Sequence, residues 1–151
     1  MSEHSSRRPG VLVSDDPADN GWMLEELALP GIRHAVVCSR DGLPLAHPAS
    51  TPREDAERLS AACAGLATLG QGLADSIDAS SPADAPPMGL PQEVIIKYDG
   101  GILFVRGAAR NTALAVLAER SIDPALVARQ MQKQVDKIGR GMNAAARVPG
   151  S

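Results

Sequence analysis

The sequence predicts a mixed α/β fold of the α+β type, in which helices cover both faces of an antiparallel sheet. Three observations support this class: a hairpin pattern at residues 32–47, a helix with a capping sequence that begins near Thr51, and three strand patterns between residues 92 and 118. Because those three strand patterns are joined by tight turns, they are expected to form an antiparallel meander.

The composition suits one domain and excludes several classes of partner. At 151 residues the chain can bury an apolar core without disulfides or metals. Its formal net charge is -3, its Lys and Arg residues are scattered, and it has one Trp, one Tyr and one Phe, so nucleic acid is not an expected partner. No apolar run reaches the length of a membrane span and no signal-peptide pattern is present, so we expect a cytoplasmic protein without membrane insertion.

The first segments predict a tail and a short helix. Residues 1–16 are polar and irregular and are expected to be a disordered tail. A helix is expected from Pro17 to Leu29, opened by Asp16 and ended by Pro30-Gly31. The apolar positions of this helix are Trp22, Leu24, Leu27 and Ala28.

The hairpin pattern indicates a buried pair of strands. Asp41-Gly42 is expected to supply the positive φ angles of a tight turn. Pro44 cannot donate a ladder hydrogen bond, so the second strand is expected at a sheet edge. Both faces of the first strand are mostly apolar, which requires cover on both sides. One face is expected to carry Ile32, His34, Val36 and Cys38, and the other Ala35 and Val37.

A long helix is expected from the capping box Thr51-Pro52-Arg53-Glu54, with Pro52 at the first helical position, to about Ile77. One stripe along it is expected to face the core: Ala56, Leu59, Cys63, Leu66, Gly70, Leu73 and Ile77. A second stripe has no large side chain and would let another backbone come close: Ala61, Ala64, Gly65, Thr68 and Gly72. The alternative, that these small residues fit the helix against its own sheet, stays open.

The second half of the chain predicts a loop, three strands and a helix. Residues 79–91 are expected to form a flexible, proline-rich loop. The strands are Gln92 to Tyr98, with Val94, Ile96 and Tyr98 on one face, then Ile102 to Arg106 and Thr112 to Ala118. Asp123-Pro124 begins a last helix whose apolar side is Leu126, Val127, Met131, Val135, Ile138 and Met142. Arg129, Lys133, Lys137 and Arg140 lie largely outside it and are expected to be solvated.

Three groups of residues between Trp22 and Gly141 carry a family resemblance. They are Pro30-Gly31-Ile32-Arg33-His34-Ala35-Val36-Val37 leading to Asp41-Gly42, then Arg53-Glu54-Asp55-Ala56 with Ala64-Gly65-Leu66, and Gly101-Ile102-Leu103-Phe104-Val105 before Ala115-Val116-Leu117. With these residues the chain resembles the roadblock family of dynein light chain-like proteins. It is most similar to the short proteins of actinobacterial four-gene clusters, which accompany a Ras-like GTPase and a sensor-kinase-like protein.

The resemblance implies a profilin-like roadblock domain over residues 17–142, with a disordered tail over 143–151. It implies a five-stranded antiparallel sheet with the long helix on one face and the terminal helices on the other. It also implies a homodimer joined through the strand that carries Val94, Ile96 and Tyr98, with the long helices side by side. The stripe Ala61, Ala64, Gly65, Thr68 and Gly72 would then be a platform for the GTPase. Two departures concern the first helix, which is a residue or two short, and the loop at residues 79–91, which is longer than usual.

No pattern in the sequence predicts catalysis, a metal site or a cofactor site. His4, His34 and His47 have no nucleophile-bearing motif beside them, and Gly70-Gln71-Gly72 lies within a helix rather than in a phosphate-binding loop. Cys38 and Cys63 lack metal-ligand spacing and are expected to be reduced core residues. We therefore expect a non-enzymatic scaffold or activator for a GTPase. The alternatives are a small-ligand sensor domain and a structural adaptor for the kinase-like partner.

Overall fold

One five-stranded antiparallel sheet organises residues 13–109 and 111–146, the part of the chain that the computed structural model describes. The strand order is β2-β1-β5-β4-β3, and the α+β class is confirmed. The elements are η2 (Pro17–Leu27), β1 (Ile32–Ser39), β2 (Pro44–Ala46), α1 (Arg53–Ser80), β3 (Glu93–Tyr98), β4 (Gly101–Ala108), β5 (Thr112–Ala118) and α2 (Pro124–Ala146).

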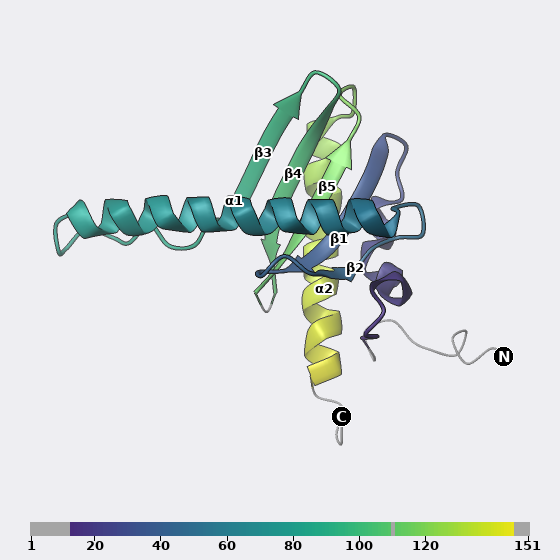
Figure 1. Ribbon diagram of the computed structural model, residues 1–151, viewed down its shortest axis with the longest axis horizontal. Coiled ribbons are helices and arrows are strands. Elements are labelled where there is room, and N and C mark those ends of the chain that lie inside the picture. Colours follow the sequence, from purple (N-terminus) through teal and green to yellow (C-terminus); the bar gives the residue numbers. More distant parts are fainter. Residues whose placement is uncertain (1–12, 110, 147–151) are drawn as a thin grey trace.

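Helices cover both faces of the sheet, as the hairpin's two apolar faces predict. In Figure 1, α1 crosses the front of the sheet and α2 lies behind it. Helix η2 packs with α2 on that second face. Val36 and Cys38 of β1 pack towards α1 in one cluster of buried side chains. Ala35 and Val37 pack in the other cluster, with residues of η2 and α2. Strand β1 therefore lies inside the domain and contributes to two cores.

The prediction that Ile32 shares a face of β1 with Val36 and Cys38 is wrong. Ile32 packs in the cluster of Ala35 and Val37, on the η2 and α2 side of the sheet. The pairing of β1 with β5 shifts register between Ile32 and His34, so the strict alternation of faces is interrupted there. This register shift depends on pairing with β5, which is distant in the sequence, so the local alternation of residues in β1 does not predict it.

The turn between β1 and β2 spans Ser39 to Gly42, and the Gly42 amide donates to the Ser39 carbonyl oxygen over 3.1 Å. Gly42 has a φ of +90°, which favours glycine, whereas Asp41 is not among the residues with positive φ. Strand β2 is at the edge of the sheet, as Pro44 predicts. A Cβ on Gly42 would lie 3.2 Å from the Cβ of Ala64, so the turn also lies close to α1.

The capping box expected at the start of α1 is absent. Pro52 occupies the N-cap position with extended backbone, and the cap has no side-chain hydrogen bond. The hydroxyl oxygen of buried Thr51 instead accepts a hydrogen bond from the Ala35 amide over 3.1 Å. Because Ala35 precedes the first pairing of β1 with β2, at Val37, Thr51 gives its amide a partner and ties the start of α1 to β1.

The terminal helices differ in detail from the expected ones. Asp16 caps η2 by accepting from the Ala18 amide, but η2 has the tighter 3-10 geometry, with a kink at Leu24. Met23 is buried, whereas the predicted apolar position Ala28 is exposed. Asp123 accepts from the Ala125 amide and caps α2, as predicted.

The boundaries of the predicted tails also change. Residues 13–16, assigned to the disordered tail, are hydrogen-bonded to η2: the Ser14 amide donates to the Asn20 side chain over 2.8 Å. Helix α2 continues to Ala146, beyond the predicted end at residue 142. The rest of the expected tails, residues 1–12 and 147–151, and the side chain of Met142 lie outside the described residues. No helix of the described ranges has both the length and the apolar character to cross a membrane.

Candidate functional site: the outer side of α1 and the free edge of β3

The stripe of small residues lies on the side of α1 that faces away from the sheet. Four of its members are exposed or half-buried at the surface and Ala64 is half-buried beside the hairpin turn: Ala61, Ala64, Gly65, Thr68 and Gly72. A Cβ atom built on Gly65 or on Gly72 would have no heavy atom of the described residues within 4 Å, apart from the neighbouring part of α1 itself. The stripe spans about three helical turns, roughly 17 Å. The alternative that these residues fit α1 to its own sheet therefore applies at most to Ala61 and Ala64, which both lie beside Gly42.

An apolar flank runs beside this stripe on the second half of α1. Leu69 is 73% exposed, Leu73 is 61% exposed and Ile77 is 42% exposed. The expectation that Leu73 and Ile77 face the core is wrong, because α1 extends past β3 and has no strand beneath its last turns (Figure 1). We name Leu69, Leu73 and Ile77 the distal apolar flank. The periodicity of the sequence did not predict that these side chains are exposed.

Strand β3 forms the second edge of the sheet. It pairs with β4 along its whole length, and no other strand among the described residues pairs with its outer side. Val94 and Ile96 lie on one face, as predicted, and are half-buried against the α1-side core. Tyr98 is 52% exposed, and Ile95 on the opposite face is 50% exposed. A row of unpaired backbone groups flanked by exposed apolar side chains is a template for pairing with another chain.

The proline-rich link between α1 and β3 lies along the projecting half of α1. The Met88 amide donates to the Asp78 carboxylate over 3.0 Å. A Cβ on Gly70 would lie 2.9 Å from the Cγ atom of Pro91, so the link nearly touches the helix there. Ala74 is buried although it lies in the second half of the helix. The link leaves the distal apolar flank open.

Comparisons with known proteins agree with this architecture. A family model described as the Roadblock/LC7 domain matches residues 21–118. The chain belongs to the Roadblock/LC7 family. The crystal structure of a Roadblock/LC7 domain from Streptomyces avermitilis is 27% identical, with a TM-score of 0.65, and the match covers 78% of this chain and 92% of that one.

Two further structures share the fold at lower identity. The gliding protein MglB from Thermus thermophilus is 20% identical, with a TM-score of 0.67 and coverage of 91% of this chain and 98% of that one. A structure described as MglB with tetrameric arrangement is also 20% identical, with a TM-score of 0.67 and coverage of 92% and 99%. No curated protein matches the chain in the corresponding search. The roadblock fold implied by the sequence resemblance is thus confirmed.

The first turns of α1 in this roadblock domain carry a mixed set of charges. Arg58 is ion-paired with Glu54 over 3.6 Å and with Asp55 over 3.1 Å, and Arg53 is paired with Glu57 over 3.4 Å. These pairs are exposed and lie within one helix, so each stabilises the fold by a few tenths of a kcal/mol at most, about 0.3–0.5. They hold both arginines along a rigid helix rather than on a loop.

Two neighbouring carboxylates of η2, Glu25 and Glu26, share a partner on α2. Lys137 Nζ lies 3.0 Å from a Glu25 oxygen and 3.6 Å from a Glu26 oxygen. Buried Gln134 completes the junction, because its side-chain oxygen accepts from the Glu26 amide over 3.0 Å. Lys137 is therefore not simply a solvated charge. The junction explains both carboxylates as structural contacts between η2 and α2.

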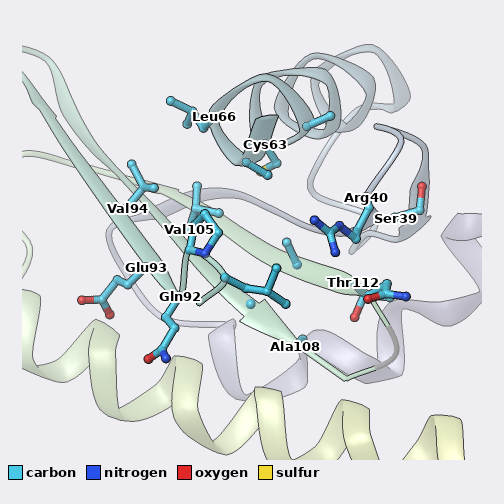
Figure 2. Close-up of a pocket in the computed structure, with 17 residues that line it drawn as sticks. Ser39, Arg40, Cys63, Leu66, Gln92, Glu93, Val94, Val105, Ala108 and Thr112 are labelled. Atoms are coloured by element: carbon cyan, nitrogen blue, oxygen red, sulfur yellow. The ribbon is translucent and has the colours of Figure 1, made fainter. Parts of the chain in front are cut away.

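An apolar cavity of about 150 Å³ lies between α1 and the sheet. Figure 2 shows Cys63 and Leu66 reaching into it from α1 above Val94 and Val105 of the strands, with Arg40 at one side. Within the described residues, no group of three or more His, Cys, Asp or Glu side chains is arranged to hold a metal. The cavity therefore offers a small, partly open space with the Cys63 side chain among its lining residues.

Cys63 and Cys38 belong to the same cluster of buried residues beneath α1. Both are free thiols, both are buried, and both belong to the cluster that packs under the helix. The hydrogen bond with Cys38 and, next, burial raise the pKa of Cys63. The hydrogen bond with Cys63 lowers the pKa of Cys38, with further help from Ser60 and the backbone of Ala113 against the opposing effect of burial. The predicted core location of both cysteines is correct.

Proposed function

We propose that this roadblock protein is a non-catalytic regulatory scaffold of the cytoplasm, which pairs with a second copy of itself and binds a Ras-like small GTPase. The observations that carry the proposal are the exposure of the small-residue stripe and of the distal apolar flank on α1, and the free edge of β3. Membership of the Roadblock/LC7 family supports the same function through the resemblance described above. In this proposal a sensor-kinase-like protein is a further possible partner.

The homodimer part of the proposal rests on β3 and the distal apolar flank. Pairing of β3 with its copy would satisfy the free backbone groups of both edges and extend the sheet across two protomers. Val94, Ile96 and Tyr98 would then lie at the dimer centre. Leu69 and Leu73, both largely exposed, would be covered by the second long helix. Oligomerisation also has a precedent in the tetrameric arrangement described for the MglB neighbour.

The GTPase part of the proposal rests on the stripe. Side chains no larger than threonine allow close approach of a partner's backbone at Ala61, Ala64, Gly65, Thr68 and Gly72. This surface lies opposite the side of α1 that holds the sheet, so partner binding and folding use different residues of one helix. We propose that the dimer scaffolds the GTPase or stimulates its GTP hydrolysis by repositioning the switch loops.

The test uses arginine substitutions on and off the stripe. Thr68 is exposed, so Thr68→Arg should cost the fold about 0.5 kcal/mol or less while placing bulk and charge where the partner docks. Ser121→Arg, exposed in the connection between β5 and α2, is the matched control. A Ras-like GTPase encoded beside this protein should be retained in a pull-down by Ser121→Arg and lost with Thr68→Arg. Normal binding by a folded, dimeric Thr68→Arg protein would contradict the docking platform.

The mechanism of stimulation has a separate test. An arginine finger needs a segment that reaches into the GTPase site, whereas Arg58 lies on a rigid helix and is paired with Glu54 and Asp55. Arg58→Ala should therefore change stimulated GTP hydrolysis less than about tenfold, and a loss on the order of a thousandfold would establish a finger instead. Ala62→Ser, a small change on the same exposed surface, is a control for the handling of variants.

A small-ligand sensor is the second candidate function, and the cavity beneath α1 favours it. Its volume of about 150 Å³ suits only a small, mainly apolar ligand. Thermal melts against a panel of such compounds separate the two candidates. A saturable rise in melting temperature that disappears when Leu66→Trp fills the cavity would favour the sensor, because Leu66 lines the cavity.

A further inference from the structure

The cavity beneath α1 is bounded by the helix, the sheet and three connections of the chain. Cys63 and Leu66 of α1 lie on one side of it, and Val94 and Val105 of β3 and β4 lie on the other (Figure 2). The turn after β1, the end of the proline-rich link and the turn between β4 and β5 complete the lining. The two walls of the cavity are therefore apolar, and its polar groups come from the connections.

Arg40 brings a positive charge to the rim of this cavity. It follows β1 in the turn, it is exposed, and it belongs to the lining residues. Figure 2 shows its nitrogen atoms directed from the turn towards the middle of the lining side chains. Among the described residues, no carboxylate forms an ion pair with Arg40.

The acidic side chains beside Arg40 in the chain and in the cavity lining are engaged elsewhere. The carboxylate of Asp41 accepts a hydrogen bond from the Ser39 hydroxyl. Glu93 is the acidic residue of the lining, and its carboxylate is paired with Arg106 over 2.6 Å. In Figure 2, Glu93 is directed away from Arg40. A negative charge for Arg40 therefore has to come from a group that the described residues do not supply.

The donors at the rim suit a carboxylate. A guanidinium group binds a carboxylate through two parallel hydrogen bonds, which gives both charge and direction to the contact. Asn111 also lines the cavity, and its side-chain amide carries a further donor. The hydroxyl of Thr112, by contrast, already donates to the Ala109 carbonyl oxygen.

The volume of the cavity limits the apolar part of a ligand. It is about 150 Å³, the size of a dry apolar cavity that accepts benzene, so it has room for a body of about six carbon atoms. Benzoate and hexanoate combine such a body with one carboxylate. Both are simple probes for a cavity that has apolar walls and a cation at its rim.

We propose that this cavity binds a small monocarboxylate, with the carboxylate paired to Arg40 and the apolar body between α1 and the sheet. The cavity is then the ligand site of the small-ligand sensor, the second candidate function above, on which the proposal rests. The carboxylate replaces the missing counterion of Arg40, while the apolar body is removed from water against side chains such as Leu66 and Val105.

The experiment measures the binding of benzoate and hexanoate to the full chain by calorimetry, with benzyl alcohol and 1-hexanol as their neutral counterparts. Both carboxylates should bind saturably and about tenfold or more tighter than the alcohols, because a hydrogen bond to a charged group contributes more than a neutral one. Arg40→Gln should remove this preference and leave binding of the alcohols unchanged. Arg33→Gln, at an exposed arginine outside the cavity lining, is the matched control and should bind as the wild type does.

Two further arms define the site. Inorganic phosphate, an anion without an apolar body, should not displace benzoate. Leu66→Trp should abolish binding of the carboxylates and the alcohols together, because it fills the cavity that both bodies occupy. Circular dichroism checks that each variant is folded. Arg40 is exposed, so the comparison of Arg40→Gln with Arg33→Gln stands even if Leu66→Trp does not fold.

Three results would overturn the proposal. Equal affinity of the wild type for carboxylates and alcohols would exclude the carboxylate class but keep the sensor. Displacement by phosphate, or carboxylate binding by Arg40→Gln as tight as by Arg33→Gln, would place the anion outside this cavity. An absence of saturable binding for all four compounds would remove the sensor as well, whereas the GTPase scaffold is judged separately by the pull-down.

Discussion

The two halves of α1 carry apolar residues at the same spacing and meet different surroundings. In the first half, Ala56 and Cys63 are buried against the sheet, and Thr51 ties the start of the helix to β1. In the second half, Leu73 and Ile77 are exposed. Figure 1 shows this end of α1 projecting past β3, with the proline-rich link alongside. A single helix thus contributes one half to the core of its own chain and presents the other half to solvent.

This difference explains how one helix can contribute both to the stability of the domain and to its association with a second copy. Burial of a leucine side chain contributes about 1.5–3 kcal/mol when it is complete. The first half obtains that stabilisation within the chain, whereas the distal apolar flank obtains it only from a partner. Substitutions in the two halves should therefore affect different equilibria: unfolding in the first half and association in the second.

The largest effect is expected where α1 is most deeply buried. Ala56→Arg places a charge and extra volume at a position with no room between α1 and β1, so it should destabilise the fold by about 4 kcal/mol or more. Ala61→Arg makes the same change on the exposed side of the same helix and should cost about 0.5 kcal/mol or less. Urea unfolding followed by circular dichroism measures both values, and equal losses would show that the helix is not divided into buried and free sides.

A smaller effect is expected at the anchor of the first half. Thr51→Val removes the acceptor of the Ala35 amide and leaves a buried donor without a partner, so it should reduce the free energy of unfolding by about 1–3 kcal/mol. Thr68→Val, on the exposed stripe, should change it by about 0.5 kcal/mol or less. The same urea titrations apply. A Thr51→Val protein as stable as the parent would remove the anchor from this account.

The smallest effect concerns the two glycines of the projecting half. Gly72→Ala meets open space and should stabilise the helix by about 0.5–1 kcal/mol, because alanine loses less backbone entropy than glycine. Gly70→Ala would bring its Cβ to 2.9 Å from Pro91 and should lose that gain unless the link moves. Comparison of the two thermal midpoints measures how firmly the link lies against α1; an equal rise for both would show that the link yields freely.

Much of the fold was predictable because it rests on local signals. The bounds of β5 agree with the predicted strand Thr112 to Ala118, and Asp123 caps α2 as expected. The position of β2 at an edge followed from Pro44 alone. In each case the deciding chemistry lies within a few residues of the chain.

The errors lie where a distant segment decides the outcome. Thr51 lies in a sequence typical of a helix cap, but its hydroxyl oxygen accepts a hydrogen bond from the Ala35 amide of β1 instead of capping α1. Ile32 changes face because of a register shift against β5. Helical spacing assigned Leu73 to the core side of α1, whereas the residue buried at that level of the helix is its neighbour Ala74.

The candidate site was predictable in part. The stripe on α1 was identified from residue size, and its exposure follows from the structure, whereas its role as a GTPase platform stays a prediction. The distal apolar flank was missed, although Leu69 lies one turn after Gly65 and one turn before Leu73 in the same helix. Its signal is an apolar stripe that continues for longer than the sheet is wide.

Light scattering at micromolar concentration tests most directly whether a second copy covers the projecting half of α1. The account predicts the mass of a dimer for the wild type and of a monomer for Leu73→Arg, which places a charge in the distal apolar flank without disturbing the chain's own core. Asp75→Arg, exposed on the other flank of the same turns, should remain dimeric. A wild-type protein that is monomeric throughout, or a folded Leu73→Arg protein that dimerises as well as Asp75→Arg, would contradict the account.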